Sequence, residues 1–165
     1  MTEEPEMSIT YRPLDPALVK ALRAGGPDAY GAAPERLISD GGGLPCRACL
    51  ADIPAGKEAL VLAHRPFDET QPYAETGPIF ICADCAGTEA SAMPPPAIAA
   101  RAEFLVKGYT ADNRIKYGTG KITPTDELDA YCRHVFADPD VEYIHVRSST
   151  NNCFFCRVER AEGAD

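Results

Sequence analysis

Hydrophobic residues along the chain form two patterns, short continuous runs and stripes that recur every three to four positions. The runs predict buried strands, because each is short and bounded by glycine, proline or polar turn residues. Two pairs of runs are joined by turn residues and predict hairpins, one turning at 111–113 and the other at 148–152. The predicted strands cover residues 8–12, 59–63, 77–81, 104–110, 114–122, 141–147 and 153–159.

Two apolar stripes predict helices with clear start and stop signals. Asp15 and Pro16 provide an N-cap and a first-turn proline for the first helix, and Gly25 ends it. Thr123 and Pro124 provide the same signals for the second helix. The stripes consist of Leu18, Val19 and Leu22 in the first helix, and of Leu128, Tyr131, Cys132, Val135 and Phe136 in the second.

The order of these elements predicts an α+β fold with a largely antiparallel sheet and two main helices. Glycine and proline between 26 and 45 predict a loop, interrupted by one helical turn at 35–38. Residues 8–160 are predicted to form a single α+β domain. We expect a flexible acidic N-terminus at 1–7 and a flexible C-terminus at 161–165.

The charge balance restricts the partners of this chain. Lys and Arg total 16 against 25 Asp and Glu, a formal net charge of -9. The surface therefore repels phosphate backbones on average, which predicts no nucleic-acid partner. Every apolar run is shorter than the ~18 residues needed to cross a bilayer, which predicts no membrane role. Residues 1–6 lack the basic and apolar stretches of a secretory signal, so we expect a cytoplasmic protein.

Four cysteines form two C-x-x-C pairs, Cys46 with Cys49 and Cys82 with Cys85. Two thiolates three residues apart on a tight turn reach one metal ion at ~2.3 Å, and four soft thiolates suit tetrahedral zinc. Because four protein ligands leave no open position for water, the predicted ion is structural, in a zinc-knuckle-like site with four cysteine ligands. Iron is the alternative metal, and buried thiols without a metal are the alternative interpretation.

A third pair, Cys153 and Cys156, has the same spacing but a different prediction. In a strand, residues three apart point to opposite faces, so these thiols would not chelate one ion. Cys132, on the stripe of the second helix, is predicted to be a small core residue. A redox pair needs a helix N-terminus to lower a thiol pKa, and none of the three pairs clearly precedes one.

A second candidate site lies on the predicted strand 141–147, where alternation places Tyr143, His145 and Arg147 on one face. Arginine offers a planar fork to carboxylates, and histidine changes charge near neutral pH, so this face would suit an anionic ligand. The sequence favours a structural role for these side chains over a ligand site. Polar strand faces are ordinary in antiparallel sheets, so these side chains would cover a solvated face and pair with nearby acids.

Three separated blocks of sequence resemble a known family. They are Pro45-Cys46-Arg47; Arg65-Pro66-Phe67 with Pro72-Tyr73-Ala74-Glu75-Thr76-Gly77-Pro78-Ile79-Phe80; and Tyr143-Ile144-His145-Val146-Arg147 with Cys153-Phe154. From about Pro45 onward, the chain resembles the bacterial family catalogued as domain of unknown function 1203. That family is uncharacterised, so the resemblance implies no activity. It implies a variant that carries two C-x-x-C pairs on a fold that is stable without them.

The sequence therefore predicts a cytosolic protein with a structural zinc ion that binds a small molecule or a protein partner. The alternative hypothesis is an enzyme that acts on a small anionic substrate. Its pocket would combine His145 and Arg147 with Arg65 and Tyr73, from the loop between two predicted strands. Glu75, in the same loop, is a further candidate to join these groups. Acid–base chemistry would require them to converge within hydrogen-bond reach.

Overall fold

The computed structural model describes residues 8–161, so the termini at 1–7 and 162–165, which were predicted to be flexible, lie outside the described residues. At the chain end that is described, the Ala161 N–H donates to the Ser8 carbonyl at 2.9 Å. The elements are β1 (Ile9–Arg12), α1 (Pro16–Arg23), β2 (Glu35–Ile38), β3 (Glu58–His64), β4 (Gly77–Cys82), α2 (Pro96–Ala99), β5 (Glu103–Tyr109), β6 (Lys121–Pro124), α3 (Thr125–Phe136), β7 (Tyr143–Ser148) and β8 (Phe154–Arg160).

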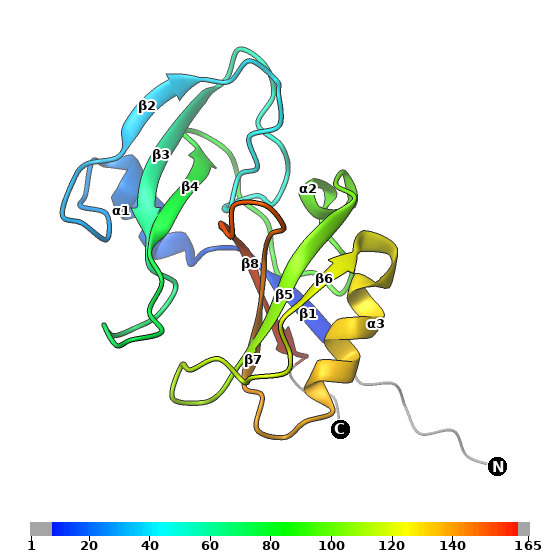
Figure 1. Ribbon diagram of the computed structural model, residues 1–165. Helices are drawn as coiled ribbons and strands as arrows, with labels where there is room; N and C mark the ends of the chain where they lie inside the picture. Colours follow the sequence, from blue (N-terminus) through cyan, green and yellow to red (C-terminus); the bar gives the residue numbers. More distant parts are fainter. Residues whose placement is uncertain (1–7, 162–165) are drawn as a thin grey trace.

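The strands form two sheets, which Figure 1 shows side by side. The larger sheet has the order β1-β8-β7-β5-β6, and the smaller has the order β2-β3-β4. All of these strand pairings are antiparallel, which confirms the predicted α+β class. The larger sheet packs α3 against one face, and α1 lies at the smaller sheet (Figure 1). None of the helices within residues 8–161 is long and apolar enough to cross a bilayer.

Each sheet has its own apolar core. The first core lies between α3 and the larger sheet and contains Leu128, Cys132, Val135 and Phe136 of the predicted stripe, with Tyr131 packed against it. The second core lies between α1 and the smaller sheet and contains Val19, Leu22, Leu60, Ile79 and Ile81. The segment of the first cysteine pair joins the two cores, because Cys46 packs in the second and Leu50 in the first.

The helical turn predicted at 35–38 is wrong, because these residues form strand β2. Glu35 pairs with Val61 and Ile38 with Glu58 along the edge of β3. Only Leu37 of the four residues is half-buried, so the segment has no apolar pattern that would mark it as a strand. Backbone hydrogen bonds to an existing strand decided its conformation.

The strand predicted over 114–122 is shorter and begins later than the sequence suggests. Only Lys121–Pro124 pairs with β5 as a strand, although the turn at 111–113 is confirmed by a hydrogen bond from the Thr110 N–H to the Arg114 carbonyl at 2.8 Å. The intervening residues turn again, and the Thr119 hydroxyl accepts the Gly108 N–H at 2.9 Å. A side-chain hydroxyl, and not a neighbouring strand, therefore accepts this backbone N–H of β5.

The helix α3 begins one residue after the predicted position. Thr123 is buried in β6 and its hydroxyl donates to the Lys121 carbonyl at 3.0 Å, so it is not available as an N-cap. The helix starts at Thr125, whose N–H donates to the Ala102 carbonyl at 2.9 Å. Acidic Asp126 and Glu127 in the first turn favour the positive end of the helix dipole.

Candidate metal centre

The four cysteines of the two predicted pairs converge at the end of β4, in the core of the smaller sheet. Cys46 and Cys49 lie in the loop before β3, Cys82 ends β4, and Cys85 follows it. Their sulfur atoms all lie within 4.8 Å of one another. A tetrahedron with metal–sulfur bonds of ~2.3 Å has edges of ~3.8 Å, so small side-chain movements bring these atoms to coordination distance. The four sulfur atoms therefore lie close enough together to hold one metal ion.

Backbone N–H groups point at the sulfur of Cys46 and prepare it to carry negative charge. The sulfur accepts the N–H groups of Ala48 at 3.3 Å, Cys49 at 3.4 Å and Cys82 at 3.1 Å. The Cys49 thiol and then these N–H groups lower the pKa of Cys46 to about 5, against the opposing effect of burial. Orienting hydrogen bonds of this kind are typical of the groups around metal ligands.

The other thiols respond in the opposite direction. Hydrogen bonding to Cys46 raises the pKa of Cys49, and burial followed by the Cys46 charge raises the pKa of Cys82 to about 12. Sulfurs this close cannot all ionise without a cation between them, because their negative charges repel. A bound cation reverses this effect and holds the thiols deprotonated. The cluster therefore has the electrostatics of a cation site.

The first cysteine pair lies on a tight turn that requires an unusual backbone conformation. Leu50, directly after the pair, has a φ of 57°, in the left-handed region that side chains rarely adopt. Its N–H donates to the Cys46 carbonyl at 2.8 Å, and its own carbonyl accepts the Ala97 N–H at 3.0 Å. Burial of the Leu50 side chain in the first core holds this strained turn in place.

Arg23, in the last turn of α1, supports the second cysteine pair. Its Nε donates to the Cys82 carbonyl and its Nη1 to the Cys85 carbonyl, both at 3.1 Å. Its Nη2 donates to the Cys85 sulfur, also at 3.1 Å. The guanidinium thus orients one ligand and opposes the negative charge of the cluster. Nothing in the local sequence of α1 identifies this role, because the contact spans about sixty residues.

Arg47, inside the first pair, links the metal centre to the larger sheet. Its side chain is only 3% exposed. Nε donates to the Phe154 carbonyl of β8 at 2.8 Å, and Nη1 donates to the Pro45 carbonyl at 2.7 Å. The guanidinium carbon lies 4.8 Å from the centre of the Phe155 ring. Burial lowers the pKa of Arg47 to about 10, so the group remains a cation at neutral pH.

The remaining cysteines lie outside the cluster, and Cys132 is a core residue as predicted. Cys156 and Cys132 are buried in the first core, whereas Cys153 is half-buried at the end of the β7–β8 turn. Burial raises the pKa of Cys132 to about 12 and also raises the pKa of Cys156, so both stay as thiols at neutral pH. All seven cysteines are free thiols in the structure.

The polar face of β7 is buried, which overturns the prediction of a solvated face. His145 is fully buried and Arg147 is 3% exposed. Arg147 Nη2 lies 2.9 Å from His145 Nδ1, and because a guanidinium only donates, Nδ1 accepts this bond. Burial, and then the charge of Arg147, holds the pKa of His145 well below its usual range. The prediction that His145 changes its charge near neutral pH is therefore wrong.

The structure brings only some of the predicted ligand residues together. Glu75 joins Arg147 with an N–O distance of 3.8 Å, and it accepts a hydrogen bond from Lys107 at 2.7 Å. Arg65 instead donates to the Phe67 carbonyl at 3.1 Å and to the Thr70 hydroxyl at 2.9 Å, both within its own loop. Tyr73 hydrogen-bonds through its hydroxyl to Tyr117 at 2.8 Å. The four residues of the enzyme hypothesis thus do not share one set of contacts.

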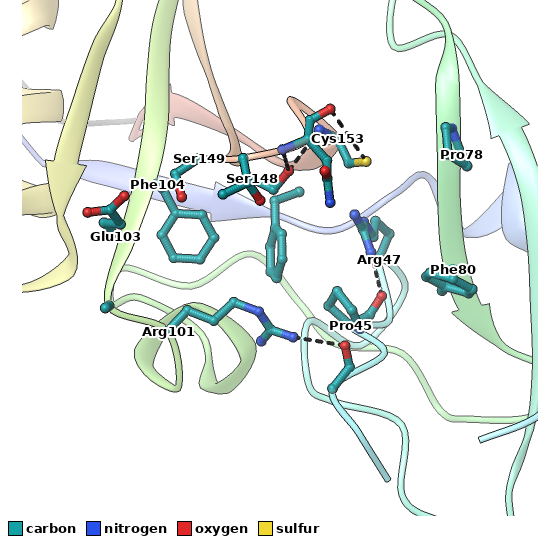
Figure 2. Close-up of a pocket in the computed structure, with 15 residues that line it drawn as sticks. Pro45, Arg47, Pro78, Phe80, Arg101, Glu103, Phe104, Ser148, Ser149 and Cys153 are labelled. Atoms are coloured by element: carbon teal, nitrogen blue, oxygen red, sulfur yellow. Dashed lines mark hydrogen bonds between the residues drawn. The ribbon is translucent and has the colours of Figure 1, made fainter. Parts of the chain in front are cut away.

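A pocket of about 730 Å³ lies between the two sheets, beside the metal centre. Figure 2 shows its walls, with Pro78 and Phe80 on β4 opposite Phe104 on β5, and with Pro45 and Arg47 beside them. The Ser148–Cys153 turn closes another side (Figure 2). The sequence analysis missed this pocket, because its residues come from four separate segments of the chain.

Comparison with known proteins gives one match. The family model described as Protein of unknown function (DUF1203) matches residues 43–160. This range includes the four cysteines and both walls of the pocket, and it begins after β1, α1 and β2. No curated protein and no solved structure matches the chain.

Proposed function

Since the chain belongs to the DUF1203 family of proteins of unknown function, we propose a function for it from its own chemistry: a cytosolic small-molecule-binding module braced by a structural zinc ion. The observation that carries the proposal is the group of four cysteine sulfurs within 4.8 Å of one another. Cys46, Cys49, Cys82 and Cys85 would fill all four positions of a tetrahedron. Such an ion stabilises the fold and leaves no open position for catalysis.

The four-thiolate donor set suits zinc. Thiolates are soft ligands, and a tetrahedral set of four is typical of structural zinc and of iron–sulfur sites. The cytosolic location is supported by the seven free thiols, because close cysteine pairs in oxidising compartments form disulfides. Iron in the same site would absorb visible light strongly, whereas zinc would not, so the two metals are easily distinguished.

The binding role is supported by the position of the pocket relative to the ion. The metal would clamp the loop at 46–49 to the end of β4. The same two segments supply one wall of the pocket, through Pro45 and Arg47 on the loop and Pro78 and Phe80 on β4. Pockets at the junction of two packed units are a common place for small ligands. Holding this wall in place is the contribution that we propose for zinc.

Metal analysis tests this proposal directly. Protein purified without added metal should contain about one zinc per chain by mass spectrometry, and a strong chelator should lower its melting temperature. A colourless preparation that contains zinc supports the proposal. A coloured preparation that contains iron would mean that the metal in this site is iron. A preparation that holds no metal, and whose melting temperature is the same with and without chelator, would contradict the metal centre.

A further inference from the structure

Arg47 is a buried cation without a carboxylate partner among residues 8–161. Its side chain is only 3% exposed, and its two hydrogen bonds go to the neutral carbonyls of Phe154 and Pro45. Buried charges in proteins are normally paired, because desolvation of an unpaired ion is costly. The thiols of Cys153 and Cys46 are near enough to act on this charge, but neither accepts one of the two hydrogen bonds of the Arg47 side chain.

The other arginine of the pocket shows the contrast. Arg101 Nη2 forms an ion pair with Asp52 at 2.9 Å, and Arg101 Nη1 donates to the Ala97 carbonyl at 2.7 Å. Its charge is therefore neutralised within the protein. Nη2 of Arg47, by comparison, forms no hydrogen bond with any of the described residues and belongs to a side chain that lines the pocket.

Apolar rings line much of the pocket, and its polar side chains, besides the two arginines, are those of Glu103 and of the 148–151 turn. Its walls carry the rings of Phe80, Phe104 and Phe155 and the prolines Pro45 and Pro78. The volume of about 730 Å³ falls within the range of ~300–1,000 Å³ found for small-molecule sites. Figure 2 shows Arg47 rising from its loop toward Cys153, between β4 and the centre of the pocket. One buried positive group thus lines a space whose walls include several flat, apolar rings.

We propose that this pocket binds an organic oxyanion, a flat apolar body that carries a carboxylate or a phosphate, with the anionic group at the Arg47 guanidinium. The inference rests on the proposed binding function and names the class of ligand. A guanidinium presents paired N–H donors to both carboxylate and phosphate. The protein has a formal net charge of -9, so the selectivity for an anion would come from this one desolvated cation and not from the surface.

Three matched probes test the ligand class on the zinc-loaded full chain, with titration calorimetry as the measurement. 2-Naphthoate and 2-naphthyl phosphate carry the two oxyanions, and 2-naphthamide has the same body without charge. At least one of the two anions should bind about tenfold or more tightly than the amide, as expected for a charge-assisted hydrogen bond. Comparison of the two anions then distinguishes a carboxylate ligand from a phosphate ligand.

Two variants assign the preference to this pocket. Arg47→Met should abolish the difference between anion and amide, whereas Arg36→Met, at an exposed arginine of β2, should keep it. Because Arg47 lies within a cysteine pair, the zinc content of each variant is measured as well. Ala102→Trp places a large ring at an exposed position of the pocket wall and should weaken the binding of every probe without touching Arg47.

Several results would overturn the inference. If the anions and the amide bind equally well, the anion preference is wrong, but the proposal of a small-molecule site still stands. The inference is also overturned if zinc-bound Arg47→Met still prefers the anions, or if Ala102→Trp does not weaken the binding of the probes. Failure of all three probes to bind counts against the inference too. Failure of the zinc proposal would appear separately, as absence of zinc in the metal analysis.

Discussion

The larger and the smaller sheet bury their residues by different means. The larger sheet has five strands and is covered by α3, a helix of 12 residues whose apolar stripe packs against it. The smaller sheet has three strands, and its helix α1 has only 8 residues. Its outer strand β2 is largely exposed. Two of the four clustered cysteines, Cys46 and Cys82, pack directly in the core of this smaller unit.

The difference is the reason that we assign the proposed metal ion a stabilising role in the smaller sheet. A large, continuous apolar core stabilises its own sheet, because burial of apolar area is the main favourable contribution. A small sheet with a short helix buries less and gains stability from cross-links or metals. We therefore expect the larger sheet to depend on packing and the smaller sheet to depend on the ion. Four changes test this comparison, in order of expected effect.

Cys82→Ser should have the largest effect, since it removes one of the four ligands. Structural zinc contributes on the order of 10 kcal/mol of binding free energy at neutral pH, so loss of the ion should unfold the smaller sheet. Hydrogen exchange should show lost protection in β3 and β4, while β7 and β8 remain protected. Cys153→Ser is the matched control and should keep both zinc and protection, because Cys153 lies outside the cluster. Equal loss of protection in both sheets would contradict the proposed division.

Phe136→Ala tests the opposite side of the comparison. This side chain is 1% exposed in the first core, and deletion of a buried phenylalanine costs about 3–5 kcal/mol. Chemical denaturation should show this loss, while metal analysis should show an unchanged zinc content. A variant that loses zinc together with stability would mean that the two cores do not act independently.

Arg23→Met should weaken the metal centre without removing a ligand. The guanidinium hydrogen-bonds to the Cys85 sulfur and to two carbonyls of the second pair. Loss of such supporting contacts costs about tenfold or more in metal affinity, which competition with a chromogenic chelator measures. Arg36→Met, which removes an exposed ion pair with Glu58, should leave the affinity unchanged. Equal affinities in wild type and Arg23→Met would remove Arg23 from the centre.

His145→Phe should change how stability depends on pH, the smallest effect of the four. The pKa of His145 is lowered in the folded state, mainly by burial, so below the unfolded pKa of ~6.5 only the unfolded chain takes up the proton. Stability is therefore complete above this pH and falls below it, by at most about 1.4 kcal/mol per pH unit. His64, whose pKa burial lowers to about 4, adds a slope of the same sign.

Denaturation measured between pH 5 and pH 7 checks this prediction, with zinc kept bound. The variant should lose the contribution of His145 and keep that of His64. Loss of the Arg147 bond to the ring lowers stability at every pH and leaves the slope unaffected. An unchanged slope would place the acid sensitivity elsewhere, in the thiol ligands, which compete with protons for the metal.

The sequence predicted the features that depend on local spacing. The stripe of α3, the N-cap of α1 and the strands at 59–63 and 77–81 follow from apolar period and turn residues, and the structure confirms them. The convergence of the two cysteine pairs was also predicted from their spacing. Each pair supplies two thiolates, and a tetrahedral metal site with cysteine ligands requires four.

Other features depend on contacts between distant segments. The polar alternation in β7 gave no sign that His145 and Arg147 are buried, because burial of a polar face requires a second layer that the strand itself does not encode. Here that layer includes Phe67, whose ring centre lies 5.2 Å from that of His145. Strand β2 has no apolar pattern and was fixed by pairing with β3.

The amino-acid sequence alone thus determined the α+β class, the group of four cysteines and the predominance of antiparallel pairing, since each is set by residue type and by short-range spacing. Only the tertiary structure decided that the strands divide into two sheets, that Arg23 supports the second cysteine pair, and that Arg47 faces the pocket. These features join segments that lie far apart along the chain. Their positions result from packing and hydrogen bonding across the whole fold, which no local pattern records.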